Sequence, residues 1–170
     1  MAQTRSALKT RPRRFESYRP LVDVLIFAAG LLGILVTVHL WIQQSRGFDQ
    51  GCFGFTTSQA IEESFDCQTV VSSGAGSLFG ISNVFWGLLF YLGVAGLSVA
   101  VSFSSNEALR QFKWMRAALV AVGMAYTLYL IYYQYFILEE YCALCLTSAL
   151  VVTTLFVLHL IDYFQLQNHR

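Results

Sequence analysis

The residues best suited to chemistry are four cysteines, Cys52, Cys67, Cys142 and Cys145, in a chain of 170 residues. Cys142 and Cys145 form a C-x-x-C motif. Residues i and i+3 share one face of a helix, so these two sulfurs can close an exchangeable disulfide within one turn. Where such a motif opens a helix, the unpaired N–H groups and partial positive charge of the first turn favour thiolate over thiol. The spacing therefore predicts a reactive pair.

The other two cysteines, Cys52 and Cys67, lie fifteen residues apart between two apolar segments. Two pairs suggest a relay, because thiol–disulfide exchange moves two electrons at a time by direct contact. One pair would exchange disulfides with a soluble protein thiol, and the other would pass the electrons to a molecule dissolved in the bilayer. A quinone is the natural lipid-soluble acceptor of two electrons.

Two other interpretations of the same residues stay open. One is a zinc site that joins the C-x-x-C to the loop cysteines, although structural zinc sites usually use two closely spaced pairs. The other is that the loop disulfide is a static staple and the C-x-x-C cysteines are small core residues. Haem attachment is excluded, because Leu146 stands where a histidine is required. We expect no metal.

The elements that must position the cysteines are hydrophobic helices. Hydrophobic residues make up 56% of the sequence and charged residues only 12%, against roughly 25% charged in soluble proteins. Four apolar segments approach the ~20 residues that cross a hydrocarbon core of ~30 Å. They cover about residues 21–42, 81–103, 117–138 and 142–161, and the second and third carry no charge. The sequence predicts an all-α integral membrane protein, a four-transmembrane-helix bundle within the lipid bilayer, because soluble helices would show polar faces.

Basic residues indicate the orientation of these spans. Ten of the eleven Lys and Arg residues precede the first span, flank the loop between the second and third, or end the chain. The loop group is Arg110, Lys113 and Arg116. By the positive-inside rule both termini are cytoplasmic, and the long loop between helices 1 and 2 is extracytoplasmic with all four cysteines, on the side where disulfides persist. The net charge of +1 suggests no nucleic-acid partner.

The expected domain plan is simple. A basic cytoplasmic tail covers residues 1–20, a four-helix membrane domain covers 21–163, and a short cytoplasmic tail covers 164–170. The compact loops lead us to expect the plasma (inner) membrane of a bacterium.

The sequence around the cysteines resembles the vitamin K epoxide reductase family. CQTVVSS at residues 67–73, LFGISN at 78–83 and GLLFY at 87–91 are similar to the family's segment from its second loop cysteine into its second span. YCALCLT at 141–147 resembles its membrane C-x-x-C. The family couples disulfide formation to reduction of a quinone or a quinone epoxide. The resemblance thus implies a stand-alone, bacterial-type thiol–disulfide:quinone oxidoreductase.

The resemblance also implies roles for the four catalytic cysteines. Cys145 would face a quinone of the menaquinone, ubiquinone or phylloquinone type. Cys142 would exchange with Cys67, and Cys52 would meet a separate thioredoxin-like protein on the extracytoplasmic side.

Around the quinone, Asn83 would donate a hydrogen bond to a carbonyl oxygen and Ser73 would steady the loop near its disulfide. The aromatic wall of the quinone site would come from Phe79, Trp86 and Phe90.

Two features depart from the family's pattern. The loop cysteines are more widely spaced than usual, and the extra residues, around 53–65, are expected to form a short helix with Glu62 and Glu63 outward. Ala149 stands where vertebrate members carry a tyrosine that helps to bind the quinone. A second hydrogen bond from that position is therefore lost, which favours quinone over epoxide reduction.

Three other functions are alternatives to a thiol–disulfide:quinone oxidoreductase. An unrelated bacterial family of quinone-linked disulfide-forming proteins places its C-x-x-C in the first outer loop, the reverse of the order here. A scaffolding membrane protein with static disulfides remains the main alternative. A transporter would place ionisable groups inside its spans, which the charge-free second and third spans argue against.

Overall fold

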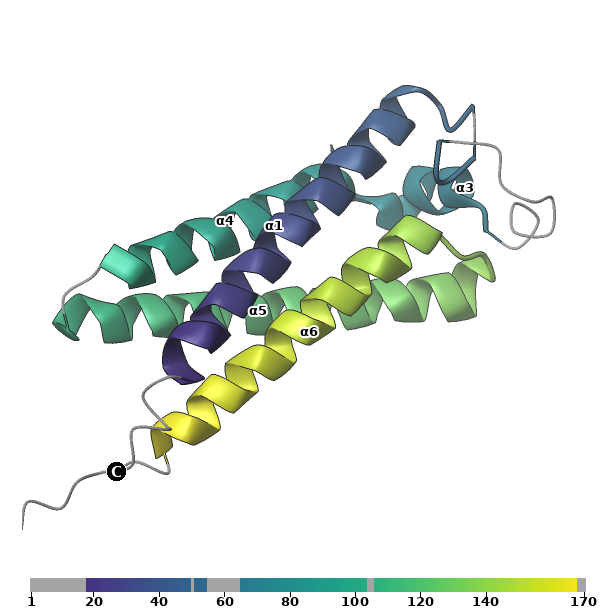
Figure 1. Cartoon of the computed structure of the whole chain (residues 1–170). Coiled ribbons are helices and arrows are strands. Elements are labelled where there is room, and N and C mark those ends of the chain that lie inside the picture. Colours follow the sequence, from purple (N-terminus) through teal and green to yellow (C-terminus); the bar gives the residue numbers. More distant parts are fainter. Residues whose placement is uncertain (1–17, 50, 55–64, 104–105, 168–170) are drawn as a thin grey trace, which may run out of the picture.

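Four long helices form the body of the molecule. The computed structural model describes residues 18–49, 51–54, 65–103 and 106–167. Its long helices are α1 (Tyr18–Ser45), α4 (Asn83–Phe103), α5 (Asn106–Tyr133) and α6 (Ala143–Gln167). α1 and α5 each pack against both α4 and α6, so the four helices close into a ring (Figure 1). The prediction of an all-α, four-helix bundle is confirmed.

The outward faces of this bundle are apolar. The described residues include four helices long and apolar enough to cross a membrane: Leu21–Ser45, Asn83–Phe103, Gln111–Leu138 and Ala143–Phe164. Leu35, Val122 and Leu150, on three different helices, are 67%, 68% and 68% exposed. Such side chains face hydrocarbon at far lower cost than water. The chain is therefore an integral, multi-pass membrane protein.

The segment between α1 and α4 folds over one end of the bundle (Figure 1). Helix α3 (Cys67–Ser72) leads into the short turn η1 (Gly74–Gly76) and then a two-stranded antiparallel hairpin, β1 (Ser77–Leu78) with β2 (Ile81–Ser82). Phe79 and Gly80 at its tip have φ of 56° and 77°, as a tight two-residue hairpin turn requires. The short helix expected around 53–65 falls mainly on residues 55–64, outside the described part.

Two helix boundaries differ from those expected. α5 begins at Asn106 rather than near residue 117, and a π-helical turn, Gln134–Leu138, follows it directly. α6 continues to Gln167, so the expected tail at 164–170 begins as helix. Hydropathy misses both extensions because they carry polar and charged residues.

Arg116, expected in a cytoplasmic loop, instead lies inside the bundle with 0% of its surface exposed. Its Nη2 donates to Asp23 Oδ1 on α1 (2.6 Å), its Nη1 to Ser98 Oγ on α4 (3.1 Å) and its Nε to His159 Nε2 on α6 (3.1 Å). One guanidinium therefore joins all four helices, and each partner offsets part of the cost of burying the charge.

Lys113 completes this buried network. Its Nζ lies 3.2 Å from a carboxylate oxygen of Asp23 and 3.1 Å from one of Asp162. The candidate span of α5 begins at Gln111 and so includes both cations, whereas the expected span, residues 117–138, carries no charge. Two cations facing two carboxylates leave the network neutral, which is how membrane interiors tolerate ions.

Close packing around Tyr91 fixes the helices beside the site. A Cβ atom on Gly33 of α1 would lie 2.2 Å from the Tyr91 ring, so only glycine fits there. The buried Tyr91 hydroxyl reaches α6, where it contacts the carbonyl oxygen (3.0 Å) and the hydroxyl (2.8 Å) of Ser148. Small residues that admit a bulky partner are a common way to hold membrane helices together.

Candidate functional site

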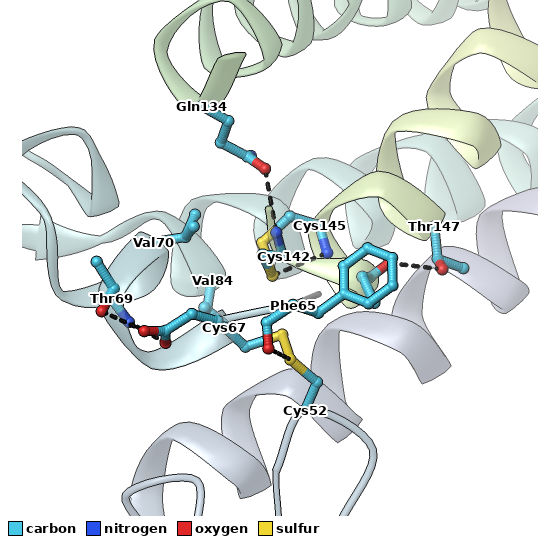
Figure 2. The surroundings of a disulfide bond; sticks show 12 residues. Cys52, Phe65, Cys67, Thr69, Val70, Val84, Gln134, Cys142, Cys145 and Thr147 are labelled. Atoms are coloured by element: carbon cyan, nitrogen blue, oxygen red, sulfur yellow. Dashed lines mark hydrogen bonds between the residues drawn. A yellow bond between two sulfur atoms is a disulfide. The ribbon is translucent and has the colours of Figure 1, made fainter. Parts of the chain in front are cut away.

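Both cysteine pairs lie in one buried cluster at the α3 end of the bundle. Cys52–Cys67 and Cys142–Cys145 are disulfides with Cα–Cα distances of 5.4 Å and 5.2 Å. All four cysteines pack in the same apolar group (Figure 2), which also includes Val70 of α3. The fold thus brings together pairs that are far apart in the sequence.

Cys142 directly precedes α6 and caps the helix with its own sulfur. Its carbonyl oxygen accepts the first helical hydrogen bond, from the Leu146 N–H (3.0 Å), and its Sγ accepts the Cys145 N–H (3.2 Å). Figure 2 shows this contact. A backbone donor aimed at a sulfur stabilises the thiolate form once the disulfide is reduced. The helix start therefore supports Cys142 as a nucleophile in disulfide exchange.

Cys67 is held at the start of α3 by the residue before it. Asp66 caps the helix: one carboxylate oxygen accepts the Thr69 N–H (2.8 Å) and the other accepts the Thr69 hydroxyl (2.6 Å). The Thr69 hydroxyl, and then its backbone N–H, hold the pKa of Asp66 below the usual 3.8. The cap is therefore ionised near neutral pH and orients a redox cysteine.

Replacing Asp66 by Ala should loosen α3. Loss of an N-cap costs about 1 kcal/mol, so amide hydrogen exchange over residues 67–73 should accelerate about fivefold. The folded pKa is lowered, so the cap's contribution is present above pH 3.8 and is lost as pH falls through the lowered pKa. Wild-type protein in acid should then approach the variant. Asp49→Ala, at an exposed aspartate of the same end, is the matched control, and equal exchange in both variants would refute the capping role.

A cavity of about 110 Å³ lies beside the C-x-x-C motif, with Cys145 on its wall. All four long helices and the α3–η1 segment contribute to a mostly apolar lining. A protein cavity of roughly 150 Å³ holds a benzene molecule, so this cavity has about three quarters of the volume that one flat ring uses there. Its lining includes Thr37, Leu40, Val71, Val84, Leu130, Ile131, Tyr133 and Ala149.

Asn83 and Ser73, both expected near a quinone, line this cavity. The side-chain nitrogen of Asn83 donates to the carbonyl oxygen of Ala75, and its oxygen accepts the Tyr126 hydroxyl (2.8 Å). Ser73 donates its hydroxyl to the Val70 carbonyl oxygen (2.8 Å). Asn83 therefore ties η1 to the start of α4, whereas Ser73 makes its hydrogen bond within the α3 segment.

The three aromatic residues expected around the ring do not line the cavity. Phe79 is 88% exposed at the hairpin tip, where the tight turn points it away from the bundle. Trp86 donates its indole N–H to the carbonyl oxygen of Leu78 (3.2 Å). Phe90 packs between α4 and α5, where a Cβ atom on Gly123 would lie 2.4 Å from its ring. The aromatic content of the sequence does not reveal which rings face the cavity.

Two polar residues of this region were missed from the sequence. Tyr126 lies in the tyrosine-rich third span and donates its hydroxyl to Asn83. Gln134 is buried on the cavity wall, and its Oε1 accepts the Cys142 N–H (3.4 Å; Figure 2). A lone amide in an aromatic, apolar stretch was the available signal, because such a group needs a partner.

Comparison with models of protein families gives a match. The model of the vitamin K epoxide reductase family matches residues 24–160, which is about four fifths of the chain. A search of curated proteins gives no match.

Proposed function

The chain belongs to the vitamin K epoxide reductase family, and from this membership we propose that it oxidises the thiols of an extracytoplasmic protein and passes the electrons to a membrane quinone. At the coarser level, membership makes it a membrane oxidoreductase that acts with a quinone. The separate protein partner and the order of the cysteines in the relay are part of the proposal.

One observation carries the proposal. The two disulfides share a single buried cluster, and Cys145 also faces the apolar cavity. Disulfide exchange requires contact between sulfurs, and a static pair of staples has no need of a neighbouring cavity. The cavity's mostly apolar wall and few polar groups suit a flat ring with carbonyl oxygens.

The relay balances as two exchanges. A dithiol of the partner protein reduces Cys52–Cys67 and leaves as a disulfide. The Cys67 thiolate then attacks Cys142, the Cys142–Cys145 bond breaks, and a second exchange closes Cys52–Cys67 again with both thiols now on the C-x-x-C. Reoxidation of Cys142 and Cys145 releases two electrons and two protons. A bound quinone supplies the acceptor for them and leaves as the quinol.

The remaining contacts support the proposed roles of individual residues. Cys52 and Cys67 are both buried, at 7% and 2% exposed, so the role of Cys52 as the cysteine that meets the partner, a thioredoxin-like protein, rests on the family resemblance. Asn83 holds η1 against α4 on the cavity wall, Ser73 bonds the Val70 carbonyl oxygen at the end of α3, and the second amide hydrogen of Asn83 can serve a quinone carbonyl.

The sidedness of the molecule is also proposed. The first turn of α1 and the last turns of α6 lie at one end of the bundle, and α3 lies at the other (Figure 1). The positive-inside rule assigns the first end to the cytoplasm, in our proposal that of a bacterial plasma membrane. The cysteines then face an oxidising compartment.

Thiol counting tests the proposal. Purified protein in detergent is fully reduced, freed of reductant, given a short-chain ubiquinone, and then labelled with maleimide for mass spectrometry. We expect rapid loss of two to four thiols, with one quinol formed for each disulfide. Thiols that stay free, or a Cys52–Cys67 bond that resists reduction beforehand, would support the scaffolding alternative instead.

A further inference from the structure

One polar side chain of the cavity wall has no part in the cysteine relay. Gln134 is the first residue of the π-helical turn Gln134–Leu138 and is only 6% exposed. Such turns are rare and often occur at functional sites, where they change the direction of side chains within a helix. A buried amide in an apolar span also costs free energy unless its polar atoms find partners.

Only the oxygen of this amide has a partner among the residues that the structure describes. Oε1 accepts the N–H of Cys142 (3.4 Å). Nε2 carries two hydrogens and makes no hydrogen bond to any described residue. Every fully buried side-chain nitrogen or oxygen in the described part has a partner, so Nε2 is not closed off. Gln134 lines the cavity, so its amide lies beside that space.

The hydrogen bonds of the other polar groups in the cavity indicate what the two Gln134 donors bind. The Asn83 side chain is already bonded to Ala75 and Tyr126, which leaves one amide hydrogen for one of the two quinone carbonyls, and Ala149 offers no hydrogen bond. A quinone carbonyl oxygen is only an acceptor, so it needs a donor from the wall. Gln134 provides two donors in the cavity that Cys145 lines, and its other end is bonded to Cys142.

We propose that Gln134 binds the quinone by donating its side-chain N–H to a carbonyl oxygen, while its Oε1 keeps the Cys142 backbone in place. This inference rests on the proposed function, because it names the residue that recognises the acceptor. A single side chain then holds both the quinone ring, through its N–H, and the backbone of the redox pair, through its Oε1.

Binding to the fully oxidised protein tests the inference without turnover, because no thiol is present to reduce the quinone. Gln134→Met keeps the length of the side chain and removes both hydrogen-bonding functions. Gln111→Met makes the same change at an exposed position of α5 and is the matched control. Loss of one neutral hydrogen bond should weaken the binding of a short-chain ubiquinone about fivefold to tenfold. The control should bind as wild type does.

Infrared spectroscopy of ubiquinone labelled with ¹³C at its carbonyls gives a readout that altered packing alone would not produce. A hydrogen bond lowers the stretching frequency of the bonded carbonyl. In Gln134→Met the bound carbonyl band should therefore move toward that of the free quinone, and in Gln111→Met it should stay at the wild-type position.

Gln134→Glu keeps the test decisive should the methionine variant not fold. The carboxyl group retains an oxygen for the Cys142 N–H, donates an O–H when protonated, and only accepts when ionised. Its Kd for ubiquinone should therefore rise as pH increases through the ionisation of that carboxyl. The Kd of wild type should stay flat over the same range.

The outcomes separate the inference from the function on which it rests. Wild-type binding together with unchanged Kd and carbonyl frequency in the Gln134 variants would overturn the role of Gln134 and leave the proposed function standing. A wild-type protein that neither binds nor reduces the quinone would overturn both.

Discussion

Cys145→Ser should abolish quinone-dependent thiol oxidation, lowering the rate by about 10³-fold or more, because this cysteine lines the cavity and no other sulfur can close the C-x-x-C disulfide. The variant should also accumulate a mixed disulfide. Without Cys145, Cys142 is a free thiol that can attack Cys67 of the Cys52–Cys67 disulfide and release Cys52 as a thiol. No Cys145 thiol remains to resolve the resulting Cys67–Cys142 bond, so this bond should persist. Peptide mass mapping of non-reduced digests would detect this bond, and quinol formation would report the rate.

Thr147→Ser is the matched control for this experiment. Thr147 is exposed half a turn beyond Cys145 and its hydroxyl bonds the carbonyl oxygen of Ala143 (2.9 Å), which serine can also do. It should keep the wild-type rate. Full activity of Cys145→Ser would refute the relay, whereas loss of activity with an intact Cys52–Cys67 bond would reassign the cysteine that exchanges with Cys142.

Arg116→Met should have the largest effect on stability. The substitution removes three hydrogen bonds, to Asp23, Ser98 and His159, and takes one cation from a neutral buried network. Breaking a buried ion pair from one side costs about 3–5 kcal/mol, a large part of a total stability of roughly 5–15 kcal/mol. Unfolding in mixed detergent micelles with increasing denaturing detergent would measure the loss.

Two variants sharpen this measurement. Arg46→Met makes the same change at an exposed arginine outside the bundle and should alter stability by no more than about 0.5 kcal/mol. Arg116→Lys keeps the charge but cannot make three directed contacts, so it should lie between the two. A loss in Arg116→Met no greater than that in Arg46→Met would show that the network adds nothing to the fold.

The sequence alone was sufficient for the main features of the fold. Each apolar segment is long enough to cross a bilayer, and this property depends on composition rather than on neighbours, so the four spans could be found by inspection. The C-x-x-C disulfide at the start of α6 follows from helical geometry, which places residues i and i+3 on one face. The family could be recognised from short motifs in the right order around Cys67 and Cys142.

Tertiary structure alone decided which side chains meet. The network around Arg116 joins residues from all four helices, and hydropathy, which assigns each residue a fixed value, placed this arginine in a loop. The π-helical turn that buries Gln134 leaves no sequence pattern, because it depends on how the end of α5 packs beside Cys142. Phe79 and Phe90 show the converse, because both lie near the site in the sequence but not on the cavity wall. A tight turn directs Phe79 away from the bundle, and Gly123 leaves room for Phe90 between α4 and α5. Local sequence determined the helices and the cysteine chemistry because these depend on neighbours along the chain, whereas the cavity and its polar wall depend on neighbours in space.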